Sequence, residues 1–447
     1  MMAYILGDDM DMFKITRGQN NNRNNMISPI RENSVANENP FSVTVTKIDN
    51  GGSKGRVDIE NGFGDNTVEY TYTSDLETST FYKTLKPLLL SMSFFGLYQC
   101  SLKKDGLGNA KRYFCTLYSM FVVLLGWANF ARYVASFWLD KDTNEEYHVA
   151  AIVSTVWLFQ CAANGTVCFY LCMSAKYSVF FQHFQRYCQS PTSFSLGLNV
   201  DTRWLRKIVL VFVMICLGFV TSNVACLLFL IYGPLESSRN ETAIFLTPFD
   251  LSSHIAVQLT VIAGYVVASA SWVFPIAITC VVSMQLGRQF TKLTENLSRQ
   301  VKNGTQGLNN MEDFRTEHQH LSNSVRLADS IFAFLILLAV ASNLPLACFL
   351  LFQLVVANHQ FSILMSIMVG FWLLINFLNI GMISWSSAVM HEKAHNAEHS
   401  LHDIPLRSRI ENHKMLQITL FISRLNGAPI AFTIWKLVPL TKPFILR

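Results

Sequence analysis

Six long runs of apolar residues constrain the fold more than any other feature of the sequence. They lie at 113–138, 149–173, 208–232, 255–284, 331–356 and 361–385. All but the fourth hold about 25 residues, enough for a helix to cross a hydrocarbon core of about 30 Å with some tilt. Because a bilayer offers no water to the backbone, spanning segments of this length have to be helical. The runs therefore predict an all-α, polytopic membrane helical bundle with six spans.

Composition supports a membrane protein. Of the 447 residues, 51% are hydrophobic and only 15% are charged, whereas soluble domains carry roughly 25% charged residues. The net charge of +5 is small and does not indicate binding to nucleic acid. Most of the ten Cys residues lie in or beside the apolar runs, where Cys behaves as a small hydrophobe. No disulfide framework is indicated, and the sequence gives no sign of a cofactor.

The N-terminal part of the chain differs from the rest. Residues 1–80 are polar, contain "GQNNNRNNM" and "DNGGSKGR", and show no apolar periodicity. Such a segment cannot bury enough surface to offset its ordering entropy, so we expect a disordered cytoplasmic tail. The next segment, 81–112, includes the short apolar run 84–100, which Pro87 and Gly96 interrupt. We expect an interfacial or re-entrant entry helix there instead of a span.

The Lys and Arg residues predict the orientation. They concentrate before the first run, between the second and third, between the fourth and fifth, and after the sixth. The alternate connections are poor in them: "LDKDTNEEYH" holds one Lys, "GPLESSRNETAIFLTPFD" one Arg, and "ANHQ" neither. Since Lys and Arg favour cytoplasmic loops, the N-terminus is predicted to lie inside. The sequon at Asn240 then lies outside and is predicted to be glycosylated, whereas those at Asn164, Asn296 and Asn303 are predicted to stay unmodified.

The stretch HEKAH, at His391–His395, matches the H-E-x-x-H pattern of zinc proteases. Two His residues four apart share one helix face and can bind one metal, with Glu392 as general base. A catalytic site also needs a third ligand and a shielded chamber, but this motif follows the sixth run among basic residues. We interpret it as the solvated face of a cytosolic helix. An integral-membrane zinc metalloprotease using His391, Glu392 and His395 is kept as the alternative function.

Several stretches resemble the invertebrate gustatory receptor (insect-type chemoreceptor) superfamily, in order along 84–447. "TLKPLLLSMSFFGLY" is similar to the entry segment of that family, and "HLSNSVRLADSIFAFLILLAVASNLPLACFLLFQLV" to the segment leading into the fifth span. "SSAVMHEKAHNAEHSLHDI" resembles the helix after the sixth span, and "QITLFISRLNGAPIAFTIWKLVPLTKPFILR" the run into the seventh. The resemblance implies an intracellular N-terminus, long cytosolic helical extensions and a cytosolic anchor region.

The family has a seventh span that continues past the position of "KPFILR", where this sequence stops. We therefore expect a six-span bundle over 113–390, followed over 391–447 by a cytosolic helix region and the start of an incomplete seventh span.

The same resemblance implies a chemosensory receptor, with taste as the default role, in the plasma membrane. It further implies a ligand-gated cation channel that assembles as a homo- or hetero-tetramer and binds a small molecule among the outer halves of the spans. Depth and side-chain chemistry suggest a set of candidate pocket residues, for which helix packing is at least an equal explanation. The candidates are Trp127, Arg132, Trp157, Gln160, Tyr265, Trp272 and Asn343.

Overall fold

The computed structural model describes residues 43–48, 54–59, 68–71, 79–99, 106–139, 145–232, 255–302, 311–356, 363–402 and 412–445. The chain divides into two compact units, Met1–Glu77 and Thr78–Arg447.

The described part of the first unit is a small antiparallel sheet. Its strands are β1 (Val43–Ile48), β2 (Lys54–Ile59) and β3 (Val68–Thr71), in the order β1-β2-β3. Val and Thr recur in these strands, and β-branched residues suit a pleated sheet. The polar composition of residues 1–80 predicted disorder and not these strands. Disorder over the rest of 1–80 stays a prediction, because most of those residues lie outside the described part.

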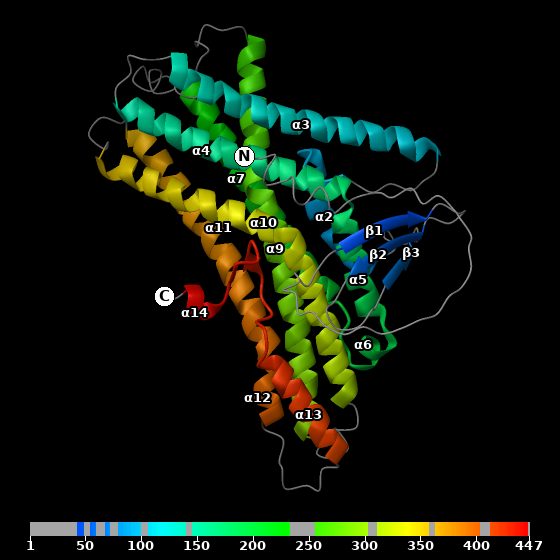
Figure 1. The fold of residues 1–447 in the computed structure, drawn as a ribbon. Helices are drawn as coiled ribbons and strands as arrows, with labels where there is room; N and C mark the ends of the chain where they lie inside the picture. Colours follow the sequence, from blue (N-terminus) through cyan, green and yellow to red (C-terminus); the bar gives the residue numbers. More distant parts are fainter. Residues whose placement is uncertain are drawn as a thin grey trace, which may run out of the picture. The chain divides into compact units, whose positions relative to one another are not determined.

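The second unit is a helical bundle, which confirms the all-α fold class (Figure 1). Its helices are α2 (Thr80–Phe94), α3 (Gly106–Leu139), α4 (Glu145–Met173), α5 (Lys176–Gln189), α6 (Pro191–Ser195), α7 (Thr202–Tyr232), α9 (Ile255–Lys302), α10 (Met311–Val356), α11 (Ile363–His395), α12 (Ala397–His402), α13 (Asn412–Leu425) and α14 (Lys442–Ile445). Among the described residues, six helices are long and apolar enough to cross a membrane, and each covers one of the six predicted spans, except that 361–362 of the sixth lie outside the described residues.

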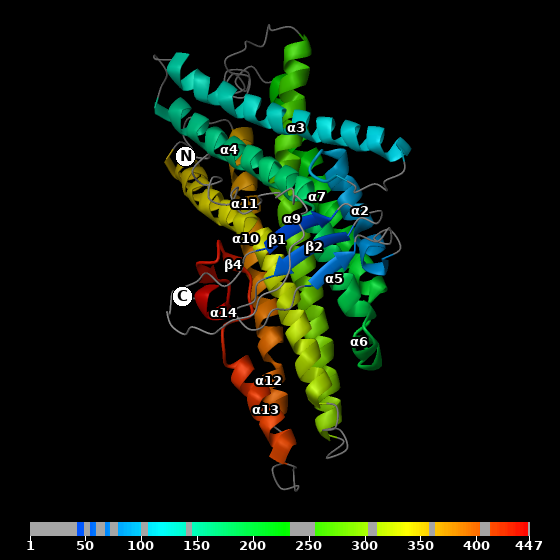
Figure 2. The same cartoon turned by 45° about the vertical axis from the view of Figure 1, so that its right-hand side comes forward.

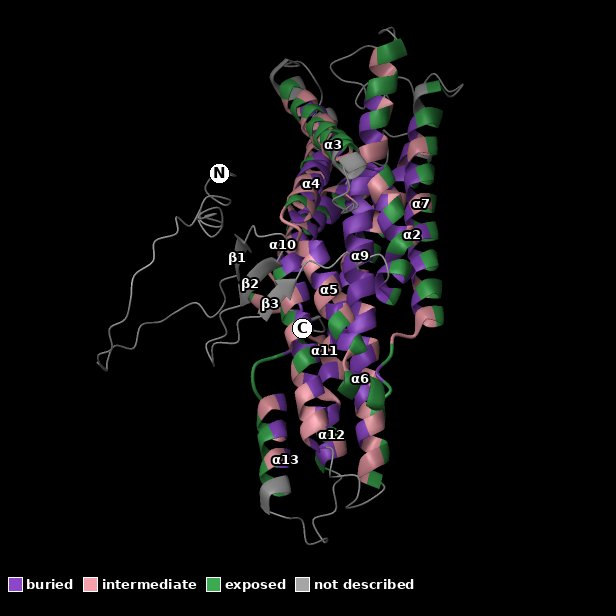
Figure 3. Ribbon diagram, turned by 90° about the vertical axis from the view of Figure 1, so that its right-hand side faces the viewer, coloured by how far each residue is buried: buried purple, intermediate pink, exposed green. Residues whose placement is uncertain are grey.

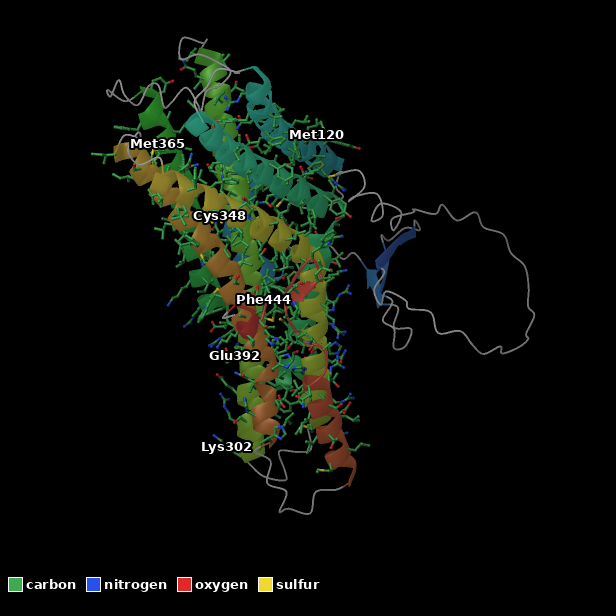
Figure 4. The ribbon with its side chains drawn as sticks, turned by 60° about the vertical axis from the view of Figure 1, so that its left-hand side comes forward. Met120, Lys302, Cys348, Met365, Glu392 and Phe444 are labelled. Carbon is green, nitrogen blue, oxygen red and sulfur yellow. The ribbon has the colours of Figure 1, made fainter. Side chains whose placement is uncertain are left out.

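Two of these helices continue far beyond their apolar runs. α9 has 48 residues and α10 has 46, so each is roughly 70 Å long and exceeds a hydrocarbon core of about 30 Å. Their polar ends lie beside α12 and α13 at the lower end of the bundle in Figure 2. In Figure 4, Met365 marks the upper end of α11 and Lys302 the lower end of α9. These projecting helices lie where the resemblance placed the anchor region, whose cytosolic location stays a prediction.

α9 is the central helix of the bundle. It packs against α4, α7, α10 and α11, and 89% of its most apolar window is buried, against 17% for α3 (Figure 3). On α3, Phe114, Leu117 and Phe121 are exposed. Exposed apolar side chains on a predicted span match the hydrocarbon of lipid tails. α3 is therefore a peripheral helix with a broad face suited to lipid.

α2 corresponds to the predicted entry helix. The Ser79 hydroxyl caps its first turn by accepting from the Tyr82 N–H at 3.2 Å. The helix runs through Pro87 and ends at Phe94, and Gly96 just after it has a φ of 71°, which suits glycine. A Cβ there would meet Val122 Cγ2 at 2.7 Å. α2 packs against α7 and α5; its depth in the membrane stays a prediction.

The C-terminal segment forms a short hairpin and one further turn of helix. β4 (Thr433–Ile434) pairs with β5 (Val438–Pro439), and α14 follows. Trp435 and Lys436 at the hairpin tip both have positive φ, a conformation that costs non-glycine residues energy and persists only when the surroundings hold it.

Candidate ligand cavity

A cavity of about 50 Å³ lies among α4, α7, α9, α10 and α11. Since one water needs roughly 10–15 Å³ of such space, the cavity has room for several waters or a small organic group. Its lining consists of Val153, Ser154, Trp157, Asn223, Leu227, Tyr265, Trp272, Leu346, Leu350, Met368, Trp372 and Asn376. Five helices thus contribute to one mostly apolar site with a few polar groups, the usual composition of a small-molecule pocket.

Aromatic rings form much of the wall. The Trp157 ring on α4 stacks on Tyr265 of α9, with centroids 5.7 Å apart, and meets Trp272 edge-on at 6.0 Å. Both contacts lie in the range that favours aromatic pairs. Tyr265 and Trp272 are seven residues apart, two turns along α9, and therefore lie on the same face of that helix. The ring system is preassembled by helix packing.

The side-chain amide of Asn223 holds the fourth aromatic ring of the lining, that of Trp372, in place. The Asn223 Oδ1 on α7 accepts from the Trp372 Nε1 on α11 at 3.0 Å, and the Asn223 Nδ2 donates to the Ser269 Oγ on α9 at 2.5 Å. A buried amide joining three helices fixes their register, because each lost partner would leave a polar group unsatisfied in an apolar environment.

The lining carries no Asp, Glu, Lys, Arg or His. Arg132 lies behind it: its Nε and an Nη both donate to Asn129 Oδ1, at 3.1 and 2.9 Å, and its guanidinium is 4.8 Å from the Tyr133 ring centre. The Tyr133 hydroxyl is in turn 2.5 Å from that of Tyr265. Arg132 therefore reaches the cavity wall through tyrosines, since it is also bonded to the lining residue Tyr265.

The structure places the other predicted pocket residues as follows. Trp157, Tyr265 and Trp272 line the cavity. Asn343 does not line the cavity but contacts a residue that does, because its Oδ1 accepts from the Trp272 Nε1 at 3.1 Å. Two candidates lie away from it, namely Trp127, which donates to Thr166 at 2.9 Å, and Gln160, which is fully buried and has no hydrogen-bond partner for its amide.

Among the lining residues that were not candidates, Asn223, Trp372 and Asn376 carry an amide or an aromatic ring. The two amides stand out in apolar runs, which is the signal that could have selected them. Which amides of different helices face one cavity depends on the rotation of each helix, and a single sequence does not give that rotation.

Of the sequons, Asn240 and Asn303 lie outside the described residues. Asn164 is buried and donates to the Ser271 carbonyl at 3.2 Å, and the Asn296 amide is bonded to the Leu196 carbonyl. Both amides are engaged within the bundle.

HEKAH lies against the C-terminal segment. The His391 Nδ1 donates to the Ile430 carbonyl at 3.2 Å, and the His395 Nε2 accepts from the Ile430 N–H at 3.4 Å. Glu392 is paired with Lys442 of α14 at 2.7 Å, and Figure 4 shows Glu392 and Phe444 on neighbouring elements. Within the described residues, no group of three His, Cys, Asp or Glu forms a metal site.

The motif therefore fastens the C-terminal segment to α11. Both imidazoles contact one backbone position, and the carboxylate that would act as general base is paired with a lysine. The zinc protease alternative gains no support from this geometry.

Comparisons with known proteins agree with the fold. The structure is similar to that of the insect olfactory receptor OR5 from Machilis hrabei, with a TM-score of 0.59 and 15% identity over 83% of this chain and 96% of that one. The same receptor in complex with eugenol gives a TM-score of 0.60 at the same identity and coverage. No curated protein matches the sequence significantly. The family described as 7tm Chemosensory receptor matches residues 85–447. This multi-pass membrane protein therefore belongs to the 7tm Chemosensory receptor family, whose members are receptors and not enzymes.

Proposed function

We propose that the protein is a subunit of a ligand-gated cation channel that a small molecule opens by binding in the cavity between α4 and α11. The observation that carries the proposal is the cavity itself, which is lined by four aromatic rings and two amides from five different helices. A ligand there would touch every one of those helices, and its binding would favour the arrangement of helices that fits it better.

The relatives support a small-molecule ligand. OR5 from Machilis hrabei, which shares this fold, has a structure in complex with eugenol. The resemblance to gustatory receptors adds the cation channel, the tetramer of identical or related subunits and the plasma membrane, with taste as the default role. We carry all of these to this chain as parts of the proposal.

α11 offers a mechanical route from the cavity to the rest of the subunit. Met368, Trp372 and Asn376 line the cavity near one end of α11, whereas His391 and Glu392 hold the C-terminal segment near the other. From Trp372 to His391 the helix rises roughly 28 Å. A helix packed along its length moves as a unit, so a shift of Trp372 would displace the C-terminal segment.

A cavity-filling variant tests the site. We expect Leu350→Trp, on α10 in the lining, to raise the half-maximal concentration of an activating compound at least tenfold in whole-cell recordings, because the larger ring occupies the space. Eugenol is the first compound to apply, followed by a panel of tastants. Leu351→Trp is the matched control, since Leu351 is the next residue and is 49% exposed. Equal responses of the two variants would contradict the site.

The orientation has its own test. An N-terminal tag should be inaccessible to antibody on intact cells, and Asn240→Gln should abolish the glycosidase-sensitive mobility shift by itself. A tag stained without permeabilisation, or a shift that survives in the Asn240 variant, would refute the proposed topology.

A further inference from the structure

The polar side chains of the cavity divide into engaged and open groups. The engaged ones bond to the protein: Asn223 with Trp372 and Ser269, Trp272 with Asn343, Tyr265 with Tyr133, and Ser154 with Tyr133. Two lining groups are buried and have no partner, the Trp157 Nε1 and the Asn376 Oδ1. An unmade hydrogen bond at a buried polar atom is costly, so such atoms mark where a ligand can gain most.

The polarity of both open groups is fixed. An indole nitrogen carries a hydrogen and only donates. The Asn376 amide donates from its Nδ2 to the Trp372 carbonyl at 2.9 Å. A carbonyl only accepts, so the amide cannot be turned round without placing two acceptors together. The open atom is therefore the amide oxygen, and the cavity presents one free donor and one free acceptor.

We propose, resting on the proposed function of this cavity, that its ligands are small neutral molecules bearing a hydroxyl group, that is, alcohols or phenols. The hydroxyl oxygen accepts from the Trp157 Nε1, and the hydroxyl hydrogen is donated to the Asn376 Oδ1. A hydroxyl is the smallest group that satisfies a donor and an acceptor with one heavy atom, which suits a cavity of about 50 Å³.

The electrostatics of the site favour neutral ligands. No Asp, Glu, Lys, Arg or His lines the cavity, and moving an unpaired charge into such surroundings costs far more than moving a hydroxyl. Arg132, which contacts Tyr133 and Asn129 and is bonded to the lining residue Tyr265, would repel a cationic ligand. The aromatic walls of Trp157, Trp272 and Tyr265 then enclose the hydrocarbon part of the ligand.

Three probes of similar size separate these contacts. Cyclohexanol donates and accepts, cyclohexanone only accepts, and methylcyclohexane does neither. Apparent affinities come from the concentration dependence of the melting temperature of the full-length protein in lipid nanodiscs. Empty nanodiscs measure how far each probe partitions into the lipid. We expect cyclohexanol to bind roughly three- to tenfold more tightly than cyclohexanone, and cyclohexanone more tightly than methylcyclohexane by a similar factor.

Two variants assign the contacts to their side chains. Trp157→Phe should abolish the preference for cyclohexanone over methylcyclohexane and keep that for the alcohol over the ketone. Asn376→Leu should abolish the preference for cyclohexanol over cyclohexanone and keep the preference for cyclohexanone over methylcyclohexane. Trp127→Phe and Asn379→Leu are the matched controls, because Trp127 is bonded to Thr166 and Asn379 is buried on the same helix as Asn376, and neither lines the cavity. Both should keep the wild-type order.

The wild-type protein alone can overturn the proposal, even where a variant fails to fold. Methylcyclohexane binding as tightly as cyclohexanol, or none of the three probes binding, rejects a hydroxyl-bearing ligand. The proposed function is judged separately by Leu350→Trp: it stands if that variant raises the half-maximal concentration of an activating compound at least tenfold, whatever the chemistry of the compound.

Discussion

The indole Nε1 of Trp372 on α11 donates to the Asn223 Oδ1 on α7 at 3.0 Å, tying together two helices that border the cavity. Trp372→Phe keeps most of the ring and leaves the buried amide oxygen without this donor. We expect a loss of about 1–3 kcal/mol in the free energy of unfolding, measured as a lower melting temperature of the purified receptor. Trp385→Phe, on the same helix at a residue that is 68% exposed, should melt like the wild type. Equal melting temperatures of the two variants would show that the bond contributes nothing.

The Asp329 carboxylate on α10 holds the C-terminal hairpin. It accepts from the Thr433 N–H at 2.6 Å and from the Thr433 hydroxyl at 3.0 and 2.9 Å. These bonds support a hairpin whose tip residues Trp435 and Lys436 have positive φ. Asp329→Ala should therefore release the hairpin, at a cost of roughly 1.5–3 kcal/mol for hydrogen bonds to a charged group.

Hydrogen exchange of residues 430–440 measures that release. Thr433→Val, which removes the hydroxyl and keeps the backbone N–H, should give a smaller increase in exchange. In the double variant the two effects should not add, because both side chains belong to one interaction. Full additivity would contradict a direct coupling.

Glu392 is paired with Lys442, and both side chains are partly exposed, at 40% and 43%. Such pairs contribute little, so Glu392→Gln should change the free energy of unfolding by less than about 1 kcal/mol and leave the ligand response intact. The same substitution would abolish the activity of a zinc protease that uses this carboxylate. A response lost in Glu392→Gln but kept in Lys442→Gln would assign Glu392 a role beyond the ion pair.

His183 on α5 gives the stability a pH dependence. Burial, with help from His320 and Arg186, lowers the pKa of His183 from 6.5 to about 4, and its Nδ1 lies 3.3 Å from the Ser324 Oγ. Between pH 6.5 and pH 4 the unfolded chain binds a proton that the folded chain does not. Stability from this residue is therefore full above pH 6.5 and falls as the pH drops towards 4, by on the order of 1–3 kcal/mol.

Comparison of the wild type with His183→Gln separates the contribution of His183 to the pH dependence of stability from the contributions of the other histidines. The variant should lose less stability than the wild type on acidification from pH 7 to pH 4.5, as measured by melting temperature. Parallel curves for the two proteins would contradict the shifted pKa.

The sequence by itself determined where the spans lie. An apolar run of about 25 residues in a bilayer can satisfy its backbone only as a helix, so the ends of α4 at Met173 and of α7 at Tyr232, and the start of α9 at Ile255, followed from composition. The resemblance to gustatory receptors implied the long helical extensions that the polar continuations of α9 and α10 form. Pro87 was misleading, because α2 runs through it. Burial of Leu85, Leu88 and Leu89, at about 1.5–3 kcal/mol each, outweighs the roughly 3 kcal/mol that an internal proline costs.

Only the tertiary structure decided which side chains meet. Trp157, Tyr265 and Trp272 could be proposed from their depth, but Asn223, Trp372 and Asn376 join them because of how five helices are rotated and packed. HEKAH shows the same limit, since its partners at Ile430 and Lys442 lie 35 or more residues away along the chain. Periodicity and hydropathy are local properties and determine where each helix forms. A cavity, or the attachment of the C-terminal segment to α11, depends on contacts between distant segments.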